Sequence, residues 1–309
     1  MKNIIITTAI ILTVSFAFAQ QLPVQSQFSN NLYSINPAVA GSLPYNPINM
    51  SYKKLWNGID EAPQLAYLSS NVAISPKVGL GGKMYSYTSG PISKTGMEAS
   101  YAYHLNIGSS TKLSLGISAF MYQFTLDQAS LNFEDPNDPI VFGASDKLIV
   151  PDAAFGALAY GKNWYGGFSI YQLFNRKISM TSEDLEQRQV RHYNVHGGYI
   201  YEINPNYVLQ GDLLLKISEA SDFQAEVSAK CFVMQTAWAG VSYQSGNALS
   251  LMVGVGKERF AIGYAYDIAL TEIKKQTSGS HEIMLIYTLP QNKWQRRSFI
   301  PTGASDSKL

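Results

Sequence analysis

The chain contains 309 residues, and its 23 basic and 22 acidic residues leave a net charge of +1 at neutral pH. Only 15% of the residues are charged, compared with about 25% in an average soluble protein, and 12% are aromatic. This composition argues against a highly charged, soluble surface, and it shows neither the basic excess of a nucleic-acid-binding protein nor an acidic tail.

The first predicted element is a secretory signal peptide over residues 1–19. Lys2 supplies its positive end, an apolar run extends from Ile4 to Phe16, and Ala17-Phe18-Ala19 matches the A-x-A pattern of a cleavage site. Cleavage there makes Gln20 the first residue of the mature chain. A retained anchor helix is the alternative, although the apolar run is short for a stable span.

The next segment, residues 20–47, contains the stretch NNLYSINPAVAGS from Asn30 to Ser42. Asn36 can cap a short helical turn with Pro37 at its first position, where the missing N–H of proline costs nothing. We hypothesise that residues 22–46 fold into or across the periplasmic mouth of the domain that follows and seal it. The alternative is a simple leader into the first strand.

Alternation of apolar and polar residues dominates the chain from residue 48 to residue 289. Between Phe260 and Ile268 every second residue is large and apolar, and the residues between them are small or acidic. Successive side chains of a strand point to opposite sides, so this pattern predicts strands with one apolar face. The single cysteine, Cys231, falls on such a face, which predicts a buried and unreactive thiol. About fourteen segments show the pattern: residues 48–56, 64–74, 77–88, 95–107, 111–125, 153–161, 164–171, 192–203, 206–217, 222–234, 236–244, 247–256, 259–270 and 280–289.

The connections between these segments alternate in length. If the N-terminus lies in the periplasm, the connections after even-numbered strands of an outer-membrane barrel are short turns, and those after odd-numbered strands can be long. The long connections, over residues 57–63, 126–152, 172–191 and 271–279, all follow odd-numbered strands. A count of twelve strands would preserve the same alternation and remains an alternative.

A large periplasmic β-sandwich or propeller would also alternate, but its outer faces should carry charge. Here the apolar faces carry Tyr and Trp residues such as Trp164 and Tyr243, which are typical of aromatic girdles at the two membrane interfaces. We therefore predict an all-β fold: a transmembrane antiparallel β-barrel of about 14 strands over residues 48–289, with both termini in the periplasm. Bulky residues on the inward faces, such as Tyr122 and Trp238, predict a partly filled lumen.

The residues that could carry chemistry form no convincing site. His192 and His196 share one strand face about 13 Å apart, at roughly 3.3 Å per residue, so they cannot hold one metal ion. The GLGGK stretch at residues 79–83 lacks the spacer and the helix of a phosphate-binding loop, and glycine in a strand more often marks a close backbone approach. Loop residues 133–147 carry three aspartates without an EF-hand pattern. We expect no enzymatic activity, no cofactor and no metal.

The C-terminal tail, residues 290–309, follows the last apolar strand. Lys293, Arg296 and Arg297 surround Trp294, so the tail could act as a short docking peptide on the periplasmic side, whereas a disordered end is the alternative.

Short motifs recur in a fixed order along nearly the whole mature chain. They include YAYHL at residues 101–105, FAIGYAYDIAL at 260–270 and SHEIMLIY at 280–287. In this order the chain resembles the PorP/SprF family of outer-membrane proteins, which belong to the type IX secretion system and its gliding machinery. Lys53 or Lys54 stands where members often have arginine. The residues that match the N-terminal family motif are Asn36, Pro37, Ala38, Gly41, Tyr52, Trp56, Gly58 and Pro63.

The resemblance implies a non-enzymatic role in the outer membrane. The implied partners are membrane lipid and a type IX cargo, such as the C-terminal domain of a surface adhesin, or the ring and peptidoglycan-binding lipoproteins in the periplasm. The protein would support the export of the cargo or its attachment at the surface. A channel for small or hydrophobic solutes is the alternative, and no nucleic acid is expected as a partner.

Overall fold

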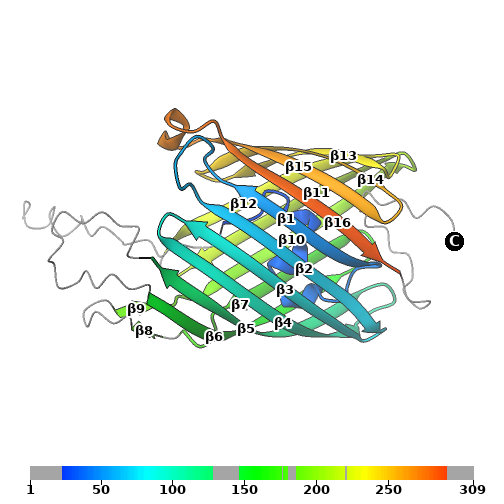
Figure 1. The fold of residues 1–309 in the computed structure, drawn as a ribbon. Helices are drawn as coiled ribbons and strands as arrows, with labels where there is room; N and C mark the ends of the chain where they lie inside the picture. Colours follow the sequence, from blue (N-terminus) through cyan, green and yellow to red (C-terminus); the bar gives the residue numbers. More distant parts are fainter. Residues whose placement is uncertain (1–22, 128–145, 176, 180–185, 220, 291–309) are drawn as a thin grey trace, which may run out of the picture.

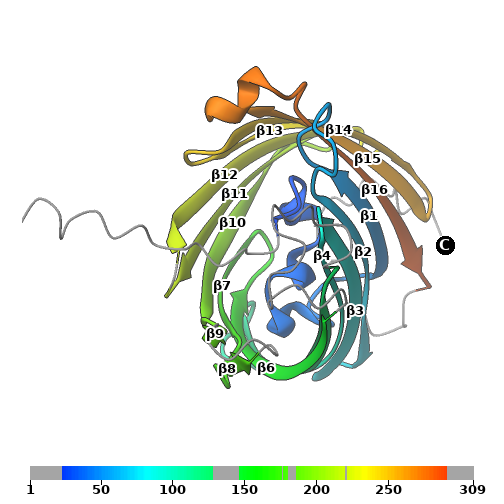
Figure 2. The same ribbon diagram turned by 60° about the vertical axis from the view of Figure 1, so that its left-hand side comes forward.

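The structure is a computed structural model, and it describes residues 23–127, 146–175, 177–179, 186–219 and 221–290. Within these residues, fourteen strands form one closed antiparallel barrel, drawn in Figures 1 and 2. The strands of the barrel are β1 Asn46–Lys54, β2 Gln64–Ser75, β3 Val78–Ser89, β4 Ile92–Asn106, β5 Lys112–Leu126, β6 Asp146–Tyr160, β7 Trp164–Tyr171, β10 His192–Asn204, β11 Tyr207–Ser218, β12 Ser221–Val233, β13 Ala237–Gln244, β14 Ala248–Lys257, β15 Phe260–Ala269 and β16 Ser280–Leu289.

Each strand pairs with its neighbours along the chain, and β1 closes the barrel against β16. This closing pair runs from Asn46 opposite Leu289 to Lys54 opposite His281. Closure leaves no sheet edge, so the backbone groups of every barrel strand can be satisfied without water. The predicted all-β barrel of fourteen strands is confirmed, and the alternative of twelve is wrong.

A small hairpin stands apart from the barrel. Strands β8 (Lys177–Ser179) and β9 (Glu186–Arg188) pair only with each other, while β7 pairs directly with β10. They lie in the connection predicted over residues 172–191, where alternation gave no signal for two strands this short.

The outward face of the barrel is apolar, and the inward face is largely polar. In β14, Val253 on the outward face is 54% exposed, whereas Met252 and Ser250 on the inward face are buried. An apolar belt of this kind is unfavourable in water and matches the hydrocarbon of a bilayer. None of the described helices is long and apolar enough to cross a membrane.

The connections divide the barrel into two different ends. The longer connections, including residues 55–63 and 270–279, gather with the β8–β9 hairpin at the left-hand end of Figure 1, which we call the long-loop end. The opposite, short-turn end has turns such as residues 76–77 and 258–259. The predicted alternation of connection lengths is confirmed.

Two details differ from the prediction. Strand β6 begins at Asp146, opposite Leu126, and not at residue 153, because its pairing with β5 continues past Pro151. Cys231 is only half-buried, because the apolar strand face on which it lies is the outer surface of the barrel and not a protein core.

The assignment of the apolar face to lipid predicts a large effect of Val253→Arg. Arginine at the middle of a lipid-facing strand should lower the free energy of unfolding in lipid vesicles by about 2–4 kcal/mol. Denaturant titration of the vesicle-embedded barrel measures this. The same change at Glu272, in a loop of the long-loop end, serves as the control and should have little effect. Equal stability of the two variants would contradict a lipid-facing outer surface.

Candidate functional site

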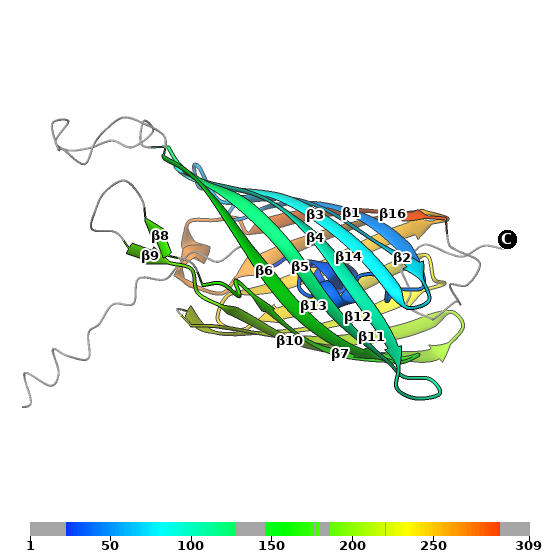
Figure 3. The ribbon, with the colours of Figure 1, turned by 90° about the horizontal axis from the view of Figure 1, so that it is seen from below.

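The lumen of the barrel is occupied by the N-terminal strap, which we define as residues 23–45. The strap lies inside the ring of strands in Figures 2 and 3, drawn in blue. It contains three single-turn 3₁₀ helices, η1 (Phe28–Asn30), η2 (Leu32–Ser34) and η3 (Pro37–Val39). Phe28 and Val39 are fully buried, so the strap is packed and not loosely threaded.

Asn36 fixes the strap to three strands at once. Its side-chain oxygen accepts a hydrogen bond of 2.8 Å from the N–H of Ala38, which caps η3 as predicted, with Pro37 at the first position. Its amide nitrogen donates to the carbonyl oxygens of Ala157 in β6 and Phe168 in β7, and it lies 2.9 Å from Nε2 of His196 in β10. The side chain is therefore both a helix cap and a clamp.

Inward-facing glycines form the bed on which the strap lies. A Cβ added to Gly79 would lie 2.0 Å from the carbonyl oxygen of Ala40, and one added to Gly116 would lie 2.4 Å from the nitrogen of Ala38. Such distances are sterically forbidden, so only glycine allows the strap backbone to approach the wall this closely. The GLGGK stretch thus serves close packing, as the sequence indicated, and not phosphate binding.

Apolar side chains cover the rest of the contact between the strap and the wall. The wall contributes Ala102, Leu158, Tyr165 and Leu214. The strap contributes Phe28, Leu32, Tyr33, Ile35, Ala38, Val39 and Ala40.

Two buried lysines hold the strap through its carbonyl groups. The first is Lys53 of β1, which forms an ion pair of 2.9 Å with Asp267 of β15. Its other hydrogen bonds go to the carbonyl oxygen of Val24 at 3.0 Å and the hydroxyl of Ser26 at 2.8 Å. An ammonium group has three donors, and all three have acceptors here. Glu282 of β16 accepts from the backbone N–H of Ser26 at 2.7 Å.

Lys83 of β3 repeats this arrangement further along the strap. It forms an ion pair of 2.8 Å with Glu98 of β4 and donates to the carbonyl oxygen of Ser34 at 3.2 Å and to the hydroxyl of Tyr171 at 2.8 Å. Buried charges are tolerated only when they are paired and hydrogen-bonded. Both lysines have a wall carboxylate as ion-pair partner, and the strap supplies a further acceptor to each of them.

The remaining part of the lumen near the short-turn end is filled by apolar side chains of the wall itself. They form a second cluster on β10, β11, β12, β13, β15 and β16: Ile200, Val208, Phe232, Trp238, Ala261, Met284 and Ile286. Strap and cluster together occupy much of the lumen, in line with the partly filled lumen predicted from the bulky inward residues.

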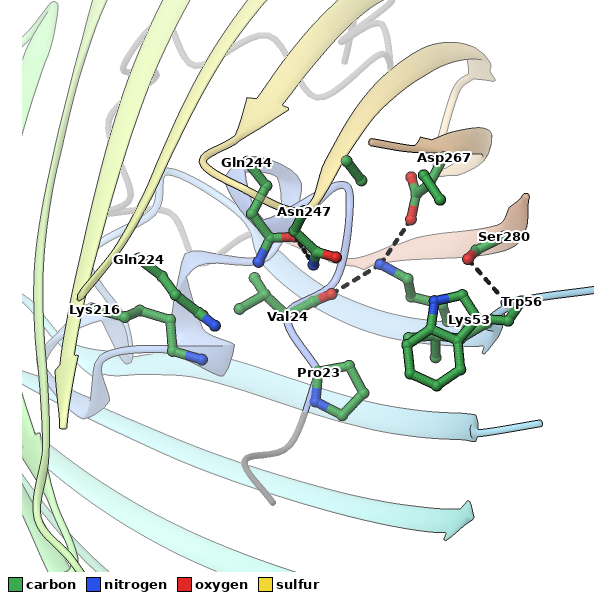
Figure 4. Close-up of a pocket in the computed structure, with 13 residues that line it drawn as sticks. Pro23, Val24, Lys53, Trp56, Lys216, Gln224, Gln244, Asn247, Asp267 and Ser280 are labelled. Atoms are coloured by element: carbon green, nitrogen blue, oxygen red, sulfur yellow. Dashed lines mark hydrogen bonds and ion pairs between the residues drawn. The ribbon is translucent and has the colours of Figure 1, made fainter. Parts of the chain in front are cut away.

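A cavity of about 110 Å³ opens at the long-loop end, beside the start of the strap. Figure 4 shows Lys216 and Gln224 on one side of it and Trp56 on the other, with Pro23 between them. Within the described residues no group of histidine, cysteine and acidic side chains is arranged to hold a metal ion.

The residues of the predicted family motif do not form one site. Asn36 caps η3, Pro37 and Ala38 lie in it, and Gly41 follows further along the strap with a φ of +73° against Gly79. The others lie on and after β1. Tyr52 faces outward and is 46% exposed, whereas Trp56, Gly58 and Pro63 lie in the connection at the long-loop end.

Several predicted features lie outside the described residues. They are the signal peptide, the loop aspartates Asp135 and Asp138, and the tail residues Lys293, Trp294, Arg296 and Arg297.

Sequence reasoning missed the charged anchors Lys53, Asp267, Glu282, Lys83 and Glu98. Their signal was present as charged residues on the inward faces of the strands, but alternation alone does not identify the partner of an inward charge.

Comparison with known proteins gives one family and a set of distant folds. No curated relative matches the chain. Among solved structures, the toluene transporter TbuX of Ralstonia pickettii is 8% identical with a TM-score of 0.51, covering 84% of this chain and 93% of the transporter. A FadL homologue of Pseudomonas aeruginosa is 10% identical with a TM-score of 0.47, covering 86% and 94% of the two chains. The likeness to TbuX shows the outer-membrane barrel fold alone.

The match to a protein family supports more than the fold, because it covers almost the whole barrel together with the strap. A model of the type IX secretion system membrane protein PorP/SprF matches residues 17–287. The chain belongs to the PorP/SprF family of type IX secretion system membrane proteins.

Proposed function

We propose that this protein is a non-enzymatic outer-membrane component of type IX secretion that binds a secreted cargo or a subunit of the machine and supports export or surface attachment. Family membership supports the role in type IX secretion. The strap inside the lumen is the observation that favours binding over conduction. A barrel packed with its own strap offers its loops, and not a pore, to other molecules.

The alternative, a channel for small or hydrophobic solutes, requires a path through the lumen. The strap packs against side chains of β4, β6, β7 and β11, and the Phe232–Trp238 cluster occupies the lumen near the short turns. The likeness to TbuX concerns the fold and carries no argument about solutes. For solutes to pass, the strap would have to leave the lumen. Its departure would break the hydrogen bonds from Lys53 and Lys83 to strap carbonyl groups and the close backbone contacts with the wall glycines.

The long-loop end offers the better-built surface for a partner. The connections over residues 55–63 and 270–279 are joined there by backbone hydrogen bonds: Asn57 donates to the carbonyl oxygen of Gly279 at 2.7 Å, and Ser278 donates to that of Asn57 at 2.9 Å. Trp56 has a φ of 48°, a strained conformation for a bulky residue that persists only where its surroundings enforce it. Such strain is often associated with functional sites.

The position of this surface indicates the kind of partner. In bacterial outer-membrane barrels the short turns face the periplasm and the longer loops face outward. A cargo held at the cell surface, such as the C-terminal domain of an adhesin, would meet the loops around Trp56. Ring or peptidoglycan-binding lipoproteins would meet the short turns instead. We therefore place cargo first among the partners.

If the strap seals the barrel, its removal should open a conducting path. Deleting residues 23–45 should raise single-channel conductance in a planar bilayer several-fold, because the strap fills much of the lumen. Gly116→Val should have a smaller effect in the same direction, since its side chain would push against the backbone of Pro37 and Ala38. Gly211→Val is the matched control: a Cβ at Gly211 would come no closer than 4.0 Å to another atom. An unchanged, closed trace after the deletion would show that the strap does not seal the barrel.

Another prediction concerns the partner. Trp56→Ala should weaken binding of the isolated C-terminal domain of a type IX cargo by about tenfold, which corresponds to about 1.4 kcal/mol. It should also release that cargo from the cell surface into the medium. Titration of the purified barrel in detergent measures the first effect, and fractionation of cultures measures the second.

Trp164→Ala is the control for this experiment, because Trp164 is an exposed tryptophan at the short-turn end of β7. Heat-modifiable mobility in electrophoresis should verify that both variants are folded. Loss of function in the Trp164 variant alone would place the partner in the periplasm and reject the cargo assignment.

A further inference from the structure

The two ends of the strap lie at opposite ends of the barrel. Near its downstream end, the carbonyl oxygen of Ala40 lies 3.0 Å from Nε2 of His104, and the N–H of Gly41 donates to Asn71 at 3.2 Å. His104 lies just before the turn at residues 107–111, and Ala40 also packs on Gly79, next to the turn at residues 76–77. This end of the strap is therefore at the short turns, where β1 begins.

The upstream end of the strap is held at the other side. Val24 and Ser26 bind Lys53, the penultimate residue of β1, and Ser26 also donates to Asp267 near the end of β15. Glu282, which accepts from the N–H of Ser26, is the third residue of β16. All three wall residues lie where their strands meet the long loops.

The middle of the strap lies between these two levels. Asn31 bonds to Ser69 in the middle of β2, and its side chain also accepts from Asn49 of β1. The anchors on β1 thus come in reverse order, first Lys53 and then Asn49, before the strap leads into the start of β1 at Asn46. The strap runs through the lumen antiparallel to β1, from the long-loop end to the short-turn end.

From this course we propose that the strap enters the barrel from the cell-surface end, so that the chain ahead of Pro23 opens to the outside of the cell. The longer loops of outer-membrane barrels generally lie on the cell-surface side, and the short turns lie in the periplasm. The sequence predicted both termini on the periplasmic side. The start of β1 and the end of β16 do lie together at the short-turn end, but the strap separates Pro23 from both.

This course adds the beginning of the strap to the surface around Trp56. Pro23 and Trp56 line the same cavity, and Lys216 and Gln224 reach toward the strap from the opposite wall in Figure 4. With cleavage after Ala19, three residues precede Pro23, and they can span at most about 11 Å. On this proposal the processed N-terminus stays close to the outer mouth.

Site-specific labelling on whole cells tests the proposal. The background is Cys231→Ala, which removes the only cysteine. A Gly-Ser-Cys insertion between Leu22 and Pro23 reports on the start of the strap. Glu272→Cys, in the 3₁₀ helix η5 (Glu272–Lys275) of the long-loop end, and Ser109→Cys, in a short turn, report on the two sides. The probe is a membrane-impermeant maleimide, applied to intact and to permeabilised cells.

The insertion and the Glu272→Cys variant should both be labelled on intact cells, and the Ser109→Cys variant only after permeabilisation. Labelling of the insertion only after permeabilisation, or in neither condition, would overturn the proposal. If the insertion prevents folding, judged by heat-modifiable mobility, Pro23→Cys takes its place with the same expected result. The outcome is independent of cargo binding, so it can fail while the proposed function stands.

Discussion

Closure of the sheet between β1 and β16 is the constraint on which the rest of the structure depends. A barrel strand in lipid has no water to satisfy its backbone, so an open edge would leave a row of unpaired groups in hydrocarbon. Pairing from Asn46 opposite Leu289 to Lys54 opposite His281 removes that edge. It also fixes Lys53 opposite Glu282, which brings two of the charges that hold the strap onto neighbouring strands.

Closure with fourteen strands creates a second requirement, because a circle of this size is wider than its own side chains can fill. The protein meets it with the strap on one side of the lumen and the Phe232–Trp238 cluster on the other. Polar residues on the inward face bind the strap. Lys53 and Lys83 each direct one donor to a strap carbonyl and another to a carboxylate, so the strap completes the hydrogen bonding of charges that the closed wall had buried.

Much of the barrel could be predicted from local pattern, because alternation and turn length are local properties. Both follow from the two-residue period of a strand and the need to cross the bilayer many times. The cap at Asn36 was predictable for the same reason, since Asn-Pro at a helix start depends on adjacent residues. The clamp formed by the same side chain was not, because Ala157, Phe168 and His196 are brought to it only by the closed sheet.

The direction in which the strap crosses the lumen could not be predicted from the sequence either. A segment of this length can cross the lumen or fold back at the near mouth, and both courses bury the same apolar residues. What decides between them is the pairing of Lys53 with Asp267, more than two hundred positions away, and its bonds to Val24 and Ser26. Glycines such as Gly79 and Gly116 indicated a close approach but not what approaches.

The end of β1 connects the strap to the loop that carries Trp56. Lys53 holds the start of the strap, and Trp56 stands three residues further along in the loop that lines the same cavity. That loop is tied down on both sides, since Leu55 donates to the carbonyl oxygen of Pro63 and Asn57 to that of Gly279. Strap, charged anchor and loop are thus joined at the long-loop end, so a partner that binds this loop would also meet the start of the strap.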